Sequence, residues 1–242
     1  MRWTTTFIFP MMLLIACNKS DEEDLIFQNP PPDYVLRLLK YFDESGNQIR
    51  EIRFDYDTDG NWIDSGNIYN NAGHLVESAW PGPWQRPYSV LYHYNEFDLI
   101  DTIKGLIPGH EQQVVFNYRI RKLEDIIVAI GGRFAHSFIL DRQREDGITV
   151  TEKDARGMIM DSSYTYLFDN GKLPFPKSYI LKNNWYPVNI SDLISDHNLL
   201  KVIVNSGENT ETVKSFRYEY DDYGFPLIQY ASDGSKVTFT YQ

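Results

Sequence analysis

The sequence contains a single cysteine, Cys17, among 242 residues. An intramolecular disulfide is therefore excluded, and the fold must depend on packing alone. Basic residues are also scarce, because 23 Lys and Arg stand against 34 Asp and Glu, for a net charge of −11. Nucleic acid or an anionic membrane face is disfavoured as a partner, since either binds clustered positive charge. A cationic ligand stays open, although acidity also serves simply to keep a protein soluble.

The sequence also lacks the usual signatures of catalysis. It has no G-x-S-x-G motif, no phosphate-binding loop and no dinucleotide fingerprint. Its five histidines have no metal-ligand spacing, and His93, between two tyrosines, is most simply a surface residue. A carboxylate pair for glycoside hydrolysis leaves no sequence trace, so that activity stays open. We expect no cofactor, and a non-enzymatic role is favoured over an enzymatic one.

Long apolar runs are missing as well. The N-terminal run from Phe7 to Ile15 follows Arg2 and is too short to span a bilayer as a helix. It predicts a signal peptide over residues 1–16. The end of this segment, "LIAC", resembles the lipobox of bacterial lipoproteins, which implies that Cys17 becomes the lipidated first residue of the mature chain. An ordinary cleavage site beside a free thiol is the alternative.

Residues 17–33 are predicted to form a tether. The acidic segment "SDEED" after Cys17 is similar to the surface-export signal of lipoproteins from the Bacteroidota, and a solvated spacer is the alternative. Three prolines follow at 30–32 and favour extended geometry that cannot join a central strand. Acyl chains on Cys17, such as palmitate, would hold the protein on a membrane. The sequence thus predicts an outer-membrane lipoprotein that faces the cell exterior.

Aromatic residues, in contrast, are abundant, with 17 Tyr, 14 Phe and 5 Trp. They recur in a pattern of alternating apolar residues, a polar turn and a Gly, as in "FDYDTDGNW" at 54–62 and "FRYEYDDYGFP" at 216–226. Alternation with period two and Asp-Gly or Asn-Gly turns indicate a β-hairpin of about 25 residues that repeats along the chain. The turn positions predicted from this pattern are Gly46, Gly60, Gly73, Asp98, Lys122, Gly171 and Gly224, with Arg144 and Asn198 as weaker candidates.

The segments 56–60 and 220–224, "YDTDG" and "YDDYG", resemble the YD repeat of Rhs-type surface proteins. The chain is more similar still to YD-repeat lipoproteins of the Bacteroidota. This resemblance implies an all-β fold, an antiparallel meander of hairpins that forms a long twisted sheet, as one domain over residues 34–242. It implies no activity. Whether the sheet is open, rolled or two-layered stays undecided, and no stretch shows sustained helical periodicity.

Asp55, Asp57 and Asp59 precede Gly60 at alternate positions, a spacing that also occurs in calcium loops. Counted from Asp55, however, position 12 is Gly66, where an EF-hand has its bidentate Glu. The other copies of the repeat do not keep the three oxygens. We therefore interpret this segment as a tight turn, with calcium as the weaker alternative and no other metal site.

Two aromatic loops interrupt the repeat and contain the candidate ligand contacts. The first, "SAWPGPWQRPY" at 78–88, has three prolines that stiffen the chain, and the second is "KNNWYPVNISDLI" at 182–194. Their rings can form a platform for a sugar or peptide, or they can cap an exposed sheet edge. The contact candidates are Trp80, Trp84, Tyr88, Trp185 and Tyr186.

These features favour a surface-anchored, non-enzymatic binding or structural module for a glycan, peptide or protein partner. A glycoside hydrolase that uses a carboxylate pair is one alternative. A chaperone or immunity partner of a secreted protein is the other. The membrane is expected as a partner through the lipid on Cys17, and nucleic acid is not.

Overall fold

The computed structural model describes residues 28–31, 33–80, 88–107, 111–142, 147–183, 190–207 and 209–242. The predicted signal peptide, Cys17 and most of the predicted tether lie outside these residues. The described chain consists of strands and two short helices, α1 (Lys177–Asn183) and α2 (Ser191–Ile194). Neither of these helices is long and apolar enough to cross a membrane.

The strands follow one another along the chain as the repeat predicts. They are β1 (Leu36–Phe42), β2 (Gln48–Arg53), β3 (Asp55–Tyr56), β4 (Trp62–Ile63), β5 (Ile68–Tyr69), β6 (Leu75–Trp80), β7 (Tyr88–Tyr94), β8 (Ile100–Gly105), β9 (Gln112–Arg119), β10 (Lys122–Ile130), β11 (Arg133–Asp141), β12 (Gly147–Lys153), β13 (Ile159–Lys172), β14 (His197–Ser206), β15 (Asn209–Tyr220), β16 (Pro226–Ala231) and β17 (Lys236–Tyr241).

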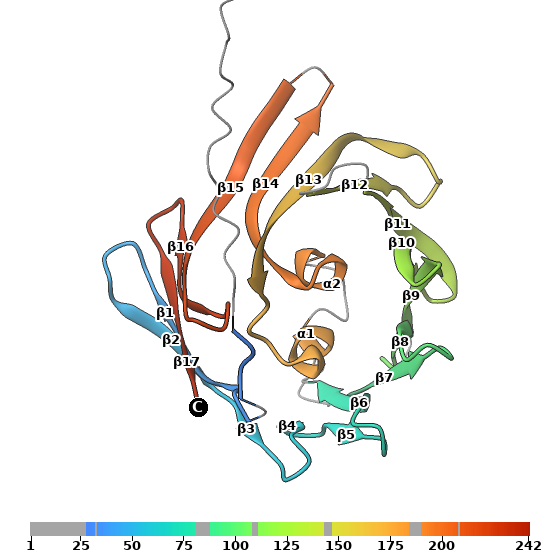
Figure 1. Cartoon of the computed structure of the whole chain (residues 1–242). Helices are drawn as coiled ribbons and strands as arrows, with labels where there is room; N and C mark the ends of the chain where they lie inside the picture. The colour runs from blue at the N-terminus through green and yellow to red at the C-terminus, as the bar shows by residue number, and fades with distance from the viewer. Residues whose placement is uncertain are drawn as a thin grey trace, which may run out of the picture.

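Fifteen strands form one antiparallel sheet in which β5 to β17 are neighbours in sequence order. The last strand, β17, pairs with β1, and β1 pairs with β2, so that β2 and β5 are the two edges. Figure 1 shows the sheet curving around α1 and α2, with the separate hairpin β3–β4 between the two edges. The prediction of an all-β antiparallel meander is confirmed. The sheet is a single curved layer, and it is not closed.

Two clusters of buried side chains join the sheet to the helices. The larger one contains Ile126 and Val128 of β10, which are fully buried, together with Leu181 of α1. The smaller one contains Leu39 of β1 and the Phe54 and Trp62 side chains around the hairpin β3–β4, against which Tyr179 of α1 packs. Each buried large apolar side chain contributes about 1.5–3 kcal/mol. Helix α1 therefore links both ends of the curved sheet through its opposite faces.

Most of the predicted turns are found where the pattern places them. Gly46, Gly60, Gly73 and Gly224 have φ between +76° and +83°, the left-handed region that glycine adopts without strain. Asp98 takes the same place with φ of +59°. The turn predicted at Lys122 lies one or two residues earlier, because Ile120 and Arg121 have the positive φ values. Arg144 lies outside the described residues.

Two of the predicted turn positions are wrong. Gly171 lies in strand β13, where the pairing with β14 is irregular, and a Cβ there would come 2.5 Å from the ring of Tyr220. Glycine is needed at this position for close approach and not for a turn. Asn198 lies in strand β14.

The two helices are the other departure from expectation. They have seven and four residues, too few for a helical period to show in the sequence and too few for stability in isolation. Burial of Ile180, Leu181 and Ile194 inside the curved sheet stabilises them instead. The second aromatic loop, predicted over 182–194, is thus helical at both of its described ends.

Candidate ligand-binding cavities

Four turns with the same geometry lie at one end of the curved sheet, because successive turns of a meander alternate between its two ends. We call this end the tyrosine rim and define it by the turns at 57–61, 70–74, 95–99 and 221–225. In the first of them, the amide of Gly60 donates to the carbonyl of Asp57, and the amide of Asp57 donates to the carbonyl of Asn61. The other three turns repeat these two bonds at the equivalent positions.

The side chain of the first residue of each turn completes this geometry. Asp57 Oδ1 accepts hydrogen bonds from the amides of Asp59 and Asn61, and Oδ2 accepts one from the Asn61 side chain. These bonds, above all the one from the Asn61 side chain, lower the pKa of Asp57. Asn70 and Asn95 bind the equivalent amides in their turns. The conserved shape needs only an Asx oxygen, which explains why Asp and Asn interchange there.

The segment that contains Asp55, Asp57 and Asp59 forms a tight turn, as the sequence predicts. Asp55 pairs with Ile63 and Tyr56 with Trp62 in the hairpin β3–β4, so strands and not helices flank the acidic segment. Within the residues that the structure describes, no group of three His, Cys, Asp or Glu side chains is placed to hold a metal ion.

Tyrosines beside these turns have partly buried rings and bonded hydroxyls. Tyr56 donates to the carbonyl of Leu36 at 3.0 Å, and Tyr94 donates to that of Leu75 at 3.1 Å. Burial raises the pKa of both phenols to about 12. Both therefore remain hydrogen-bond donors at neutral pH, and their rings form a fixed aromatic wall.

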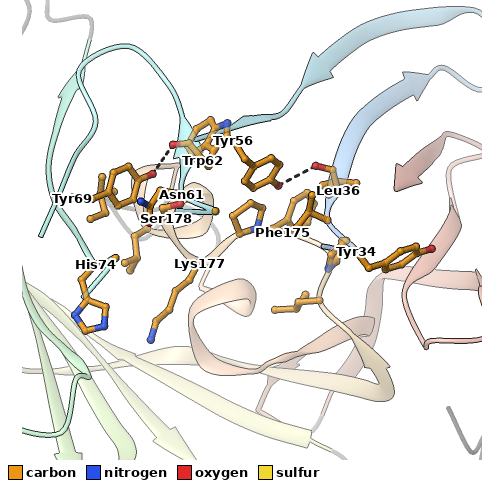
Figure 2. A pocket seen from close by; sticks show the side chains of 18 of the residues that line it. Tyr34, Leu36, Tyr56, Asn61, Trp62, Tyr69, His74, Phe175, Lys177 and Ser178 are labelled. Atoms are coloured by element: carbon orange, nitrogen blue, oxygen red, sulfur yellow. Dashed lines mark hydrogen bonds between the residues drawn. The ribbon is translucent and has the colours of Figure 1, made fainter. Parts of the chain in front are cut away.

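A cavity of about 390 Å³ opens inside the tyrosine rim, between the turns at 57–61 and 70–74 and the start of α1. Figure 2 shows it from close by, with Tyr56 and Phe175 on one side and His74 and Lys177 on the other. No Asp or Glu is found among the described residues that line it. Its aromatic lining consists of Tyr34, Tyr56, Trp62, Tyr69, Tyr94, Phe175, Phe225 and Tyr241. We call it the aromatic cavity.

Four polar side chains face the same space and come from three different segments: Asn61, His74, Lys177 and Ser178. His74 stacks on Tyr94, with ring centroids 4.6 Å apart. Tyr69 donates to the carbonyl of Trp62 at 2.7 Å, which fixes its ring at the cavity wall (Figure 2). A mostly aromatic wall with a few polar groups is typical of small-ligand sites.

A second cavity, of about 700 Å³, lies on the other side of the connection from β13 to α1. It shares Phe175, Lys177 and Phe225 with the aromatic cavity, so the two are neighbours along one segment. Its lining contains more cations than the first: Arg121, Lys122, Arg142, Lys172 and Lys177. We call it the basic cavity. Two acids, Asp192 and Asp196, also line it.

A third cavity, of about 500 Å³, lies near the gap between the sheet edges. Trp62, Trp80 and Lys182 are among its lining residues. Lys182 Nζ is 2.7 Å from Asp64 Oδ2 and 3.1 Å from Asn67 Oδ1. These contacts attach α1 to the segment between β4 and β5, so this cavity surrounds a structural ion pair.

Of the predicted contact residues, the structure describes Trp80 and Tyr88, and neither lines the aromatic cavity. Trp80 ends strand β6 and Tyr88 begins β7, and the two are paired across these strands at the end opposite the tyrosine rim. Trp80 packs partly buried against the larger core cluster. Trp84, Trp185, Tyr186 and the lipidation site Cys17 lie outside the described residues. Among the described residues, the rings that line the aromatic cavity therefore come from other segments than Trp80 and Tyr88.

A usable signal for the aromatic cavity was present in the repeat. A tyrosine stands immediately before each of the four turns, and Tyr56, Tyr69 and Tyr94 line the cavity, whereas Tyr220 does not. His93 is exposed, as predicted. The residues on the connection 173–178 carry no signal of this kind, because their role depends on the inward path of the chain between β13 and α1.

Together these features define a class of protein, an open, curved antiparallel sheet with two inserted helices and ligand-sized cavities at one rim. A porin-like protein from Bacteroides uniformis has a similar structure, with a TM-score of 0.50 and 16% identity over 89% of this chain and 100% of that chain. A porin-like protein from Bacteroides vulgatus aligns with a TM-score of 0.37 and 13% identity over 85% of this chain and 99% of that one. The sequence matches no family model and no curated protein. At such identity, the likeness to the first structure shows the fold alone.

Proposed function

We propose that this protein is a lipid-anchored, cell-surface binding module that holds a glycan in the aromatic cavity. The observation that carries the proposal is the wall of eight aromatic rings around about 390 Å³, with no acid among its described lining residues. Sugar rings present C–H faces that pack on aromatic rings, and their hydroxyls need a few polar partners. Asn61, His74 and Ser178 supply these partners.

The surface location rests on the N-terminal sequence. The lipobox-like "LIAC", the acidic segment after Cys17 and the repeat similar to YD-repeat lipoproteins all favour an outer-membrane lipoprotein. The structure with the similar fold comes from a Bacteroides species and is described as porin-like, which is compatible with that location. Replacement of Cys17 by Ala is expected to abolish incorporation of labelled palmitate and to release the protein from membranes. Retention of both would contradict the anchor.

Phe175 provides the test of the ligand site, because it lines the cavity and is partly exposed. We expect the protein to retain oligosaccharides on a glycan array. We expect Phe175→Ala to weaken that binding about tenfold, the loss of one aromatic contact and its buried area. Phe134→Ala is the matched control, because Phe134 is 39% exposed on β11 and lines no described cavity. No glycan binding by the unaltered protein, or equal binding by Phe175→Ala, would contradict the proposal.

A hydrolase is the second candidate function, and one observation favours it. Asp192 lines the basic cavity near Asp196, and burial raises the pKa of Asp192 to about 6. A carboxylic acid with a pKa near 6 keeps its proton in an appreciable fraction of molecules near neutral pH and can serve as a general acid. Release of reducing sugar from a bound oligosaccharide, lost in Asp192→Asn, would support this function over simple binding. Recovery of the oligosaccharide intact after prolonged incubation would exclude it.

A further inference from the structure

The basic cavity has the opposite charge to the protein that surrounds it. The chain carries a net charge of −11, yet this cavity has five Lys and Arg against two Asp among its described lining residues. The five come from four separate parts of the fold: the turn between β9 and β10, the end of β11, the end of β13 and the start of α1. The topology, and not a basic stretch of sequence, gathers them.

None of these five cations has a carboxylate within 4.0 Å among the described residues, whereas ion pairs of Lys or Arg with Asp or Glu occur elsewhere on the sheet, as at Lys104 and Glu111. Arg121 lies over the ring of Phe97 and Lys172 over the ring of Phe225, at 4.8 and 5.3 Å from the ring centroids. Arg142 donates to the carbonyl of Ile194 at 3.0 Å. Their charges repel one another, so the arrangement costs free energy unless an anion binds.

Arg121, Lys122, Arg142 and Lys177 are exposed at the mouth of this cavity, where a ligand can reach them. The two acids offset the cations only in part. Burial raises the pKa of Asp192 to about 6, so that near this pH much of its negative charge is lost. Asp196 is exposed and lies within electrostatic range of Arg142.

The basic cavity also shares several lining residues with the aromatic cavity. Leu173, Phe175, Lys177, Leu181 and Phe225 line both. A chain-like ligand that stacks in the aromatic cavity and passes Lys177 would come close to Lys172 and Arg142. Such a ligand needs rings for the first cavity and negative charge for the second.

We propose that the ligand is an acidic oligosaccharide. Its uronate carboxylates or sulfate groups are bound in the basic cavity by Lys122, Lys172 and Lys177, together with the neighbouring Arg121 and Arg142. This inference rests on the proposed function, since it takes the aromatic cavity as a sugar site. The net charge of the protein points the other way, toward a cationic ligand. The local charge of the cavity determines which ligand binds there, because charge-assisted hydrogen bonds act at contact distance and the field of the whole protein is screened within about 8–10 Å.

The test measures the affinity of the unaltered protein for four probes by calorimetry at low and physiological salt. The probes are a hexagalacturonate, its fully methyl-esterified form, a sulfated chondroitin hexasaccharide and a hexaglutamate. We expect the hexagalacturonate to bind about tenfold or more tightly than its neutral ester, with an affinity that falls as salt rises. The ratio of the galacturonate and chondroitin affinities distinguishes carboxylate from sulfate as the preferred anion.

A pair of variants tests the location. Lys122→Gln with Lys172→Gln changes two residues that line the basic cavity and not the aromatic one. This double variant is expected to weaken hexagalacturonate binding about tenfold or more and to leave binding of the ester unchanged within about twofold. The control, Arg133→Gln with Lys214→Gln, removes the same charge from exposed residues that line no described cavity, and should change neither. Both proteins should unfold at the same denaturant concentration as the unaltered one.

The outcomes separate this inference from the proposed function. Equal affinity for the hexagalacturonate and its ester overturns the acidic ligand and leaves the glycan site standing. Equal effects of the two double variants also overturn it. Binding of hexaglutamate as tight as that of the hexagalacturonate would make this an acidic-peptide site and overturn the saccharide. No binding of any saccharide overturns both proposals.

Discussion

Tyr56 donates a hydrogen bond of 3.0 Å from its hydroxyl to the carbonyl oxygen of Leu36, twenty residues earlier in the chain. This bond joins the hairpin β3–β4, which lies outside the main sheet, to the first residue of β1. The same contact recurs inside the sheet, where Tyr94 binds Leu75 and Tyr218 binds Leu199, each nineteen residues earlier. The repeated tyrosine thus fixes the spacing between successive hairpins.

Tyr56→Phe should lower the free energy of unfolding by about 1–2 kcal/mol, because it removes the bond and leaves the Leu36 carbonyl without this donor. Urea unfolding followed by tryptophan fluorescence measures the change. Tyr230→Phe is the control, since the hydroxyl of Tyr230 binds Glu219 on the exposed surface. The control should lose less than about 0.5 kcal/mol. Equal losses in the two variants would show that the Leu36 bond has no special role.

Two glycines test where the fold is tightly packed. Gly66 and Gly60 have nearly the same backbone conformation, with φ of +77° and +81°. A Cβ at Gly66 would collide with the Cβ of Ala79 and lie 3.0 Å from its amide nitrogen, whereas nothing lies within 4 Å of a Cβ at Gly60. Gly60→Ala should therefore cost about 1 kcal/mol from strain alone, and Gly66→Ala should cost about 3 kcal/mol or more.

Thermal unfolding of the two alanine variants gives this comparison directly. Because the backbone strain is matched, the difference between them reports the contact between Gly66 and Ala79. The amide of Ala79 also donates to the carbonyl of Gly66 at 3.1 Å, so this contact closes the sheet next to its β5 edge. Equal melting temperatures would mean that the segment moves aside to accept the methyl group.

The repeat predicted the class of fold because its information is local. Alternation in 54–62 fixes the strand faces, and the positive φ required at Gly60 and Gly224 fixes the reversals. Where a copy keeps its Asx residue and its Gly, as at 70–73, the turn lies at the predicted residue. Asp98 keeps the turn without glycine, because Asp tolerates positive φ.

Gly171 shows why the pattern fails at the helices. "DNG" at 169–171 has the composition of a hairpin turn, yet the approach of the Tyr220 ring requires a residue without a Cβ at Gly171. The chain continues through β13 and turns inward at 173–176 only because buried apolar side chains on α1, such as Leu181, pack inside the curved sheet. Such long-range packing leaves no local signal, so the sequence did not predict the cavities on either side of this segment.

Lys182 and Asp64 test the attachment of α1 to the gap between the sheet edges. The Lys182 side chain is 10% exposed and that of Asp64 39%, with 2.7 Å between Nζ and Oδ2. Lys182→Met should cost about 2 kcal/mol, because it leaves the Asp64 carboxylate and the Asn67 side chain without their partner. The partial exposure of Asp64 keeps this figure below that of a fully buried pair.

A double-mutant cycle with Asp64→Asn separates this ion pair from other effects of the substitutions. We expect a coupling energy of about 1 kcal/mol, measured by urea unfolding of the two single variants and the double variant. Lys40 and Glu51 form the comparison pair, since their charged atoms are 4.0 Å apart on the surface, and their coupling should be below about 0.5 kcal/mol. A coupling near zero at Lys182 would show that α1 is held by its apolar contacts alone.

Asp192 should make the protein less stable as the pH rises toward neutrality. Burial raises the pKa of its carboxyl group from 3.8 to about 6 in the folded state, so between these values the folded protein holds a proton that the unfolded chain has released. Stability from this residue is therefore full below about pH 4, falls between pH 4 and 6 and stays low above. Asp192→Asn should raise the free energy of unfolding at pH 7 by about 2 kcal/mol relative to the unaltered protein and leave it unchanged at pH 4.

Asp57 provides the contrast, because hydrogen bonds from Asn61 lower its pKa. The contribution of Asp57 to the free energy of unfolding is present above the pKa that Asp57 has in the unfolded chain. It is lost as the pH falls through the lower pKa of the folded protein. Asp57→Asn should therefore reduce the change of stability with pH only below about pH 4. Asn occupies the equivalent position in the turns at 70–74 and 95–99, and the substitution should therefore preserve the turn. Urea unfolding of both variants from pH 3 to pH 7 separates the two windows. A flat difference between Asp192→Asn and the unaltered protein across that range would show that the Asp192 carboxylate is solvated in the basic cavity, with an ordinary pKa.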